Sequence, residues 1–458
     1  MTYSEKVAAW AADLRIDAIP ADVIADQKNR VLDIIGTTLA ASKMPSSQPL
    51  RDGALKLGGG NESRLLGYGD RTAAATAALA NGAMAHALDY DDTHNESVVH
   101  ISGPVVTAGL SLGEAKSSSG AAALTAMIAG AELGCRIGSV TPGAFHRRGF
   151  QATGVIGGFA AGIVAGRLLG LDAAGVRNTL GICGSQAGGL MECFIDGTAT
   201  KQLHPGWAAH SGIAAAYLAQ SGFTGPATVF EGDRGFFRAY ADTTEGNYAA
   251  LTDGLGEDWS CLRTSFKPYP CGHVVHAFLD ALLMLYREEN LRAEQVERIT
   301  CPIAAWMIPV MCEPRDAKLT PATEYHAKFS FPFTMAAALT FGRLPVEAFS
   351  EAAIRDPDIL ALAEKIHHIP DPDAPGTDRF KGWVQVDTTD GRRLERIVDD
   401  NWGSLANPMT SDQVQQKFRE NADLALRTDQ IEGIVTMVDR FETLDKVGKL
   451  IDLCVRPS

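Results

Sequence analysis

The sequence of 458 residues lacks any paired arrangement of cysteines. None of its eight cysteines forms a CxxC pair, and none has the spacing of a zinc site. In a chain of this size, scattered cysteines are typical of a protein that keeps its thiols reduced. We therefore expect neither a disulfide framework nor a structural zinc ion.

The sequence also lacks an excess of positive charge and a long hydrophobic run. Its net charge of −14 argues against a nucleic-acid partner and against an anionic membrane surface. The longest uncharged stretch, residues 149–166, is rich in Gly and Ala and only reaches the lower limit of a bilayer span, roughly 17 residues. Residues 1–17 are amphipathic and carry no signal-peptide core. We therefore predict a cytoplasmic protein that binds no membrane.

What the sequence does contain is a long series of Ala-rich helical patterns. Apolar residues recur at helical spacing over residues 4–42, with Pro20 at a helix start. Residues 42–70, rich in Pro, Gly and Ser, are expected to form a connection. Further helices are expected at 72–87, 104–112, 120–137, 151–169, 175–190 and 204–221. Ala-rich helices joined by Gly-containing turns predict an all-α domain.

After about residue 258 the pattern changes to a mixture of strands and helices. Residues 296–310 alternate and are rich in β-branched side chains, and residues 381–398 predict a hairpin around Asp390-Gly391. Helices are expected at 329–341 and 356–367, and helical periodicity returns over 411–455. The sequence therefore predicts a mainly α fold with a large discontinuous helical domain, residues 1–264 and 403–458, and a smaller α+β domain, residues 265–402.

The first candidate site is residues 81–104, a short run that holds three aspartates and three histidines: Asp89, Asp91, Asp92, His86, His94 and His100. On a helix, His86, Asp89 and Thr93 would share one face. Gly103-Pro104 is expected to end the segment and to leave His100 on a loop. Such groups can bind and deprotonate a small polar molecule. The alternative is that they cap the helix and satisfy one another.

The second candidate site is residues 145–154, where His146, Arg147 and Arg148 precede a Gly-rich helix. Two arginines and a helix start can hold a carboxylate or a phosphate, and a solvated basic turn is the alternative.

The third and fourth candidates lie farther along the chain. Lys201 could serve as an acid, a base or an anion clamp if it is semi-buried, whereas His204 and His210 are expected to be structural. Residues 265–276 place His273 and His276 in a proline-fixed loop at the predicted domain junction. These two histidines lack a third ligand at a recognisable spacing, so no metal is expected there.

Taken together, these segments resemble the MmgE/PrpD family. The motifs that carry the resemblance are HALDYDDTH (86–94), His100 with Gly103-Pro104, GFQATG (149–154), TKQLHPGWAAHSG (200–212), SFKPYPCGHVVHAFLDA (265–281) and AKFSFPF (327–333). The resemblance implies a large helical domain, a smaller α+β lid domain, a homodimer, and an active site between the domains that needs no metal and no cofactor. Members of the family include 2-methylcitrate dehydratase, cis-aconitate decarboxylase and iminodisuccinate epimerase.

The resemblance also implies residue roles. Asp89, His100, Lys201 and either His273 or His276 match the catalytic residues of the family, and Thr93 matches a threonine of its acidic motif. We expect Thr93 and Gln151 to bind substrate, with Arg147 or Arg148 clamping a carboxylate and His146 as a partial substitute proton carrier. Two positions depart from the family pattern, because Gln151 replaces a histidine and Phe333 replaces a tyrosine. Both changes remove a group that can carry a proton.

The expected activity is that of a lyase on a small di- or tricarboxylate, a dehydratase or a decarboxylase that works by proton abstraction next to a carboxylate. An epimerase of a dicarboxylate is a second possibility, because it needs only one acid or base on each face of a single carbon. An inactive helical scaffold is a third, supported by Gln151 and Phe333. A fourth is an isoprenoid synthase, since Asp91-Asp92 with Glu96 faintly resembles a Mg²⁺-diphosphate motif.

Overall fold

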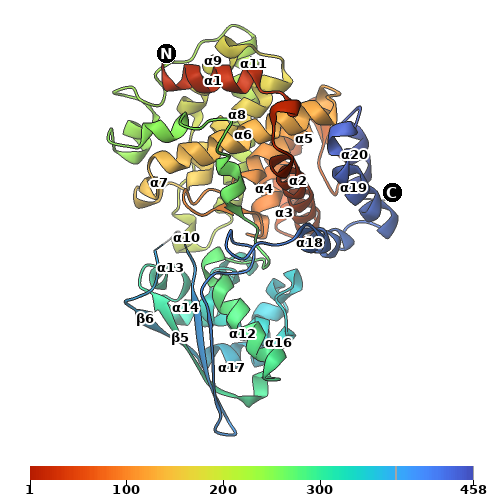
Figure 1. The fold of residues 1–458 in the computed structure, drawn as a ribbon. Coiled ribbons are helices and arrows are strands. Elements are labelled where there is room, and N and C mark those ends of the chain that lie inside the picture. Colours follow the sequence, from red (N-terminus) through yellow and green to blue (C-terminus); the bar gives the residue numbers. More distant parts are fainter. Residues whose placement is uncertain (377–378, 457–458) are drawn as a thin grey trace.

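The computed structural model describes residues 1–376 and 379–456, and most of its secondary structure is helical. The mainly α prediction is confirmed. Figure 1 shows a helical body with a smaller part below it that contains the four-stranded sheet, here called the strand-containing part. Two residues of the predicted range 265–402 and the last two of the range 403–458 lie outside the described residues.

The helical body is built from two stretches of chain that share one hydrophobic core. The core draws its buried side chains from residues 7–261 and again from residues 418–454. Its helices are α1 (Tyr3–Asp13), α2 (Ala21–Ala41), α3 (Ser47–Leu57), α4 (Ala74–Ala87), α5 (Ser102–Ala115), α6 (Gly120–Val140), α7 (Ala144–Arg147), α8 (Ala152–Leu168), α9 (Ala173–Gln186), α10 (Cys193–Asp196), α11 (Thr200–Gln220), α18 (Ser411–Asp423), α19 (Thr428–Asp439) and α20 (Gly448–Leu453). In Figure 1 the blue C-terminal helices lie beside the dark red α2.

Small residues let the central helices of the body approach closely. A Cβ atom on Gly206 of α11 would lie 2.1 Å from the main-chain oxygen of Leu79 and 2.7 Å from the main-chain nitrogen of Ala83, both on α4. The backbones of α4 and α11 are therefore in contact. This packing fixes the end of α4 next to the start of α11. Asp89 follows the end of α4 and Lys201 lies at the start of α11, so two of the candidate site residues come together here.

Helix α6 is long and apolar enough to cross a membrane by length and composition, but 89% of its most apolar window is buried inside the protein. Its neighbours are other helices of the body. We therefore describe α6 as a core helix.

The smaller part has its own hydrophobic core, drawn from residues 269–386. Its four-stranded sheet has the order β6-β5-β7-β8, in which β5 and β6 run parallel and the other pairs are antiparallel. The elements are α12 (His276–Glu288), β5 (Val296–Ala304), α13 (Ile308–Met311), α14 (Arg315–Leu319), α15 (Glu324–Ala327), α16 (Phe331–Phe341), α17 (Pro357–Glu364), β6 (Ile366–Asp371), β7 (Gly382–Thr388) and β8 (Arg393–Val398). The predicted hairpin at 381–398 is confirmed as β7 and β8.

Two local expectations are wrong. The connection predicted at 42–70 contains α3 as well as the short strands β1 (Ser63–Arg64) and β2 (Arg71–Thr72). Helix α4 stops at Ala87, and Asp89 then has a φ of +50°, which no helix tolerates. His86, Asp89 and Thr93 therefore share no helical face, because Thr93 lies on β3 (Thr93–His94), which pairs with β4 (Thr264–Ser265). Gly103 and Pro104 lie in the first turn of α5, which contains the helix expected at 104–112.

Candidate active site

A cavity of about 210 Å³ lies between the helical body and the strand-containing part. It is lined by seven of the ten site residues proposed from the sequence, namely Asp89, Thr93, His100, His146, Gln151, Lys201 and His273. These residues come from segments that are far apart in the chain. The fold thus brings the acidic run, the Lys201 segment and the proline-fixed loop to one crevice.

The centre of the polar wall is the carboxylate of Asp89, which is 1% exposed. Lys201, in the first turn of α11, forms an ion pair with Oδ1, and the ammonium of Lys267 lies 3.1 Å from Oδ2. Burial raises the pKa of Asp89, but Lys201 and Lys267 outweigh burial and hold this pKa well below its usual range. Asp89 therefore stays ionised and orients two ammonium groups at the cavity.

Lys201 is buried, and burial lowers its pKa even though Asp89 acts in the opposite direction. Its ammonium lies 5.7 Å from the ring centroid of Phe194 and 5.1 Å from that of Phe329. A lysine with a lowered pKa releases a proton more readily than an exposed lysine. Lys201 can therefore bind an anion and also donate a proton.

His100 lies on the loop that precedes α5, as its sequence position suggested. Its Nδ1 lies 2.8 Å from the main-chain oxygen of Asp92 and 3.2 Å from Oγ1 of Thr93. A carbonyl oxygen can only accept, so we assign the ring hydrogen to Nδ1 and leave Nε2 with a lone pair. Burial, reinforced by Lys267, holds the pKa of His100 well below its usual value. His100 is therefore neutral near pH 7 and suited to act as a base.

The other two aspartates of the run already have partners. Nδ1 of His86 lies 2.8 Å from Oδ1 of Asp91, and the Asp92 carboxylate binds Arg30 at 2.9 Å. Asp91 and Asp92 are fully buried and have no free face for a Mg²⁺-diphosphate group. The isoprenoid synthase alternative is therefore wrong.

The structure separates the two histidines that the sequence could not rank. His273 lines the cavity, and its Nε2 lies 3.2 Å from Nδ2 of Asn401. Burial lowers the pKa of His273 to about 3. His276 does not line the cavity, and its Nε2 lies 3.3 Å from the main-chain oxygen of Cys271. Of the two, His273 is the one in reach of a bound molecule.

The predicted carboxylate clamp is not at this cavity. Arg147 and Arg148 are exposed, and neither lines it. Arg148 instead lies 3.7 Å from a carboxylate oxygen of Asp242. Their neighbour His146 does line the cavity, and burial together with Lys201 lowers its pKa to about 4.

The two positions that depart from the expected pattern differ in their location. Gln151 is buried at the cavity, but its Oε1 accepts a hydrogen bond of 3.0 Å from the main-chain N–H of Gly154, so it caps α8. Phe333 is fully buried in the core of the strand-containing part and does not line the cavity. The change at Gln151 therefore alters the site directly, whereas the change at Phe333 lies outside its lining.

Lys267 is the site residue that the sequence reasoning missed. It is fully buried and lines the cavity, and its Nζ also lies 2.9 Å from the main-chain oxygen of Asp89. A signal was available, because Lys267 precedes two prolines in the same loop that supplied His273. The apolar side of the cavity was missed as well; it includes Met191, Phe194, Trp306, Val310, Met311, Phe329 and Phe380.

Among the described residues, His86, Asp89 and His100 form a group whose possible metal-ligating atoms lie within 4.8 Å of one another. The Asp89 carboxylate already binds two ammonium groups, which offset its charge and repel a cation. This donor set therefore suits an organic anion better than a metal ion. That the active site needs neither a metal nor a cofactor stays a prediction.

Comparison with known proteins identifies the family to which this chain belongs. Residues 5–249 match the MmgE/PrpD N-terminal domain and residues 269–443 match the MmgE/PrpD C-terminal domain. The chain is 27% identical to "Cis-aconitate decarboxylase-like protein oryM" of Aspergillus oryzae, over 97% of this chain and 95% of that protein. It is 26% identical to "Cis-aconitate decarboxylase" of Aspergillus terreus, over 98% and 96%, and 26% identical to that of Mus musculus, over 100% and 94%. The two domain matches cover most of the sequence, and the chain belongs to the MmgE/PrpD family.

Proposed function

We propose that the protein is a lyase that transfers a proton next to a carboxylate group of a small organic acid. One observation carries this proposal: two buried lysines, Lys201 and Lys267, share the carboxylate of Asp89 at a cavity that also holds His100. The relatives named cis-aconitate decarboxylase support the reaction class. A di- or tricarboxylate is the first substrate class to test.

The proposed mechanism assigns one task to each group. Lys201 and Lys267 bind the carboxylate beside the reacting carbon and stabilise the negative charge that develops there. When water is the leaving group, His100, neutral and with a free Nε2, removes the proton from that carbon, the C–H electron pair forms the C=C bond, and Lys201 donates a proton to the hydroxyl that leaves. When CO₂ leaves instead, the C–C bond supplies the electron pair, and Lys201 protonates the carbon. Asp89 keeps both ammonium groups in position, and Thr93 and Gln151 bind the remaining polar atoms.

A second candidate function is an epimerase of a dicarboxylate, and the position of His273 favours it. His100 belongs to the helical body and His273 to the loop that leads into the strand-containing part, and both line the cavity. Burial keeps both imidazoles neutral, because it lowers both pKa values. A substrate carbon between them would have a base on each face, and the ammonium of Lys201 at the same cavity could return the proton. Such an enzyme would exchange the α-hydrogen and release no group.

Several further expectations are part of this proposal. The strand-containing part is proposed to act as a lid over the cavity, and the protein is proposed to work in the cytoplasm. A homodimer is proposed as well, because Leu203, Trp207 and Leu218 expose large apolar side chains on α11.

The experiment that tests the proposed function is an NMR assay in D₂O. The protein is incubated with cis-aconitate, citrate, 2-methylcitrate, malate and iminodisuccinate, and the α-hydrogen signals are followed. A lyase gives a new product with loss of water or CO₂, whereas an epimerase gives deuterium incorporation without loss of a group. The absence of both with every acid would contradict the proposal.

A further inference from the structure

One part of the cavity lining is apolar. Trp306 is 39% exposed and Val310 is 42% exposed, and both line the cavity. Met311, Phe329 and Phe380 continue the same surface. Apolar area that faces water is unfavourable by about 25 cal/mol per Å². Such a surface is stabilised when an apolar group covers it.

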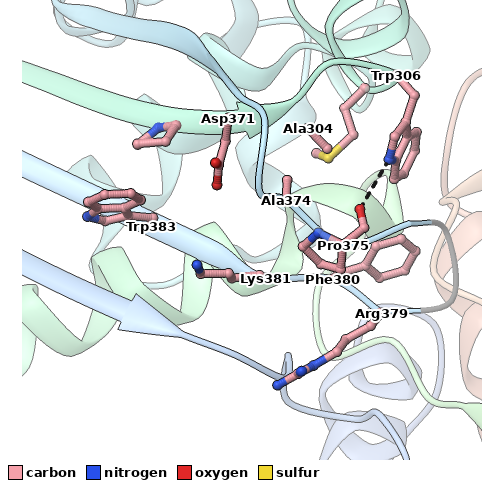
Figure 2. A pocket seen from close by; sticks show the side chains of 11 residues that line it. Ala304, Trp306, Asp371, Ala374, Pro375, Arg379, Phe380, Lys381 and Trp383 are labelled. Carbon is pink, nitrogen blue, oxygen red and sulfur yellow. Dashed lines mark hydrogen bonds between the residues drawn. The ribbon is translucent and has the colours of Figure 1, made fainter.

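This wall is held in place from behind. Figure 2 shows the indole N–H of Trp306 directed at the main-chain oxygen of Pro375, at 3.5 Å, with Phe380 close by. The ring of Phe380 lies 6.3 Å from that of Trp306 and 4.9 Å from that of His273. The hollow behind these side chains has a volume of only about 10 Å³, room for at most one water molecule. The hollow is therefore too small to bind a ligand of its own, and the side chains around it support the wall.

The polar side of the cavity carries too little positive charge to balance a substrate with many carboxylates. Among the described residues, Asp89, Lys201 and Lys267 are the charged side chains that line the cavity, and together they leave one positive charge. His100, His146 and His273 add none near pH 7, because burial lowers the pKa of each. Behind this wall, Asp91 pairs with His86. The cavity thus pairs a weakly positive side with a broad apolar side.

We infer that the wall formed by Trp306, Val310 and Phe380 binds a hydrophobic substituent of the substrate, while Lys201 and Lys267 bind its carboxylate. The substrate class is then an organic acid that carries an apolar group, rather than an acid built of carboxylates alone. The cavity volume of about 210 Å³ allows this, because a cavity of about 150 Å³ can hold benzene. This inference rests on the proposed function, since it concerns the same site.

The test is a set of dissociation constants measured by titration calorimetry for three non-reacting acids. Succinate and benzylsuccinate have the same two carboxylates and differ only in the apolar group, and tricarballylate has three carboxylates and no apolar group. We expect benzylsuccinate to bind at least tenfold more tightly than the other two, a difference of 1.4 kcal/mol. The variant Trp306→Ala should lose most of this preference and keep the affinity for succinate.

Trp383→Ala is the matched control, because Trp383 borders the hollow of Figure 2 but does not line the cavity. It should keep the tenfold preference. Equal affinities for succinate and benzylsuccinate, or tighter binding of tricarballylate, would overturn the inference and leave the proposed function standing. An equal loss of affinity for all three acids in Trp306→Ala would do the same. Failure of wild-type protein to bind any of the three would count against the proposed function itself.

Discussion

The ammonium of Lys267 binds Asp89 twice, at 2.9 Å from its main-chain oxygen and 3.1 Å from its carboxylate oxygen Oδ2. The two residues are 178 positions apart in the chain. Lys267 begins the loop that leads into the strand-containing part, whereas Asp89 lies just after helix α4 of the body. One buried ion pair therefore joins the two parts of the molecule at the cavity.

Replacing Lys267 with methionine tests this link. The variant Lys267→Met keeps the length of the side chain but leaves Oδ2 of Asp89 without its ammonium partner. Loss of one member of a buried ion pair typically costs 3–5 kcal/mol, and we expect the free energy of unfolding at pH 7 to fall by about 3 kcal/mol. Urea denaturation followed by circular dichroism measures this quantity.

The control for that experiment is Lys449→Met, which breaks an exposed pair with Asp445. Exposed pairs contribute little, so its free energy of unfolding should change by less than about 1 kcal/mol. If Lys267→Met behaved like this control, the buried pair would not stabilise the protein.

The pH dependence of the reaction follows from the shifted groups. A base must be unprotonated, and burial with Lys267 lowers the pKa of His100, so the acid limb of kcat/KM should have its midpoint below 6.5. An acid must be protonated, and burial lowers the pKa of Lys201, so the alkaline limb should have its midpoint below 10.5. A pH profile measured with a reacting acid checks both limbs. An acid midpoint at or above 6.5 would show that His100 is not the base.

Close packing of α4 against α11 leads to a prediction about stability. A methyl group added at Gly206 would meet the backbone of α4 at 2.1 Å, which cannot be relieved by moving a side chain. We expect Gly206→Ala to lower the free energy of unfolding by about 3 kcal/mol or more. It should also weaken substrate binding, because α11 carries Lys201.

Gly53→Ala provides the matched control, since it lies in helix α3 and its added Cβ would meet nothing within 4 Å. This change should stabilise the protein by about 0.5–1 kcal/mol, because alanine is the better helix former. Thermal unfolding of both variants gives the comparison. Equal effects at the two positions would contradict the proposed contact of backbones.

Many of the helices and the β7–β8 hairpin could be predicted because their local signals are strong. Pro20 marks the start of α2, and Asp390-Gly391 marks the turn between β7 and β8. Helix α3 was missed because Pro, Gly and Ser in residues 42–70 resemble a loop, although Pro49 lies in the first turn of that helix, where proline is tolerated. Strand β6 was missed because its apolar residues continue the pattern of α17.

The site was harder to predict, because its geometry depends on contacts between distant segments. Asp89 has a positive φ, which ends the helical pattern of the run and turns its carboxylate toward two lysines. Lys267 was overlooked because a single lysine in a sequence is usually exposed, and only its 178-residue contact with Asp89 shows otherwise. Arg147 and Arg148 were overvalued for the opposite reason, because their charge is exposed.

The central claim is that His100 and Lys201 carry the proton transfer, and one experiment tests it most directly. His100→Gln and Lys201→Met are compared with wild-type protein in the D₂O assay, with an acid whose α-hydrogen wild-type protein removes or exchanges. Removal of a general acid or base typically lowers the rate 10²–10⁴-fold, so both variants should lose at least about 10²-fold in the rate of α-hydrogen transfer. Rates within about twofold of wild-type protein in either folded variant would contradict the account.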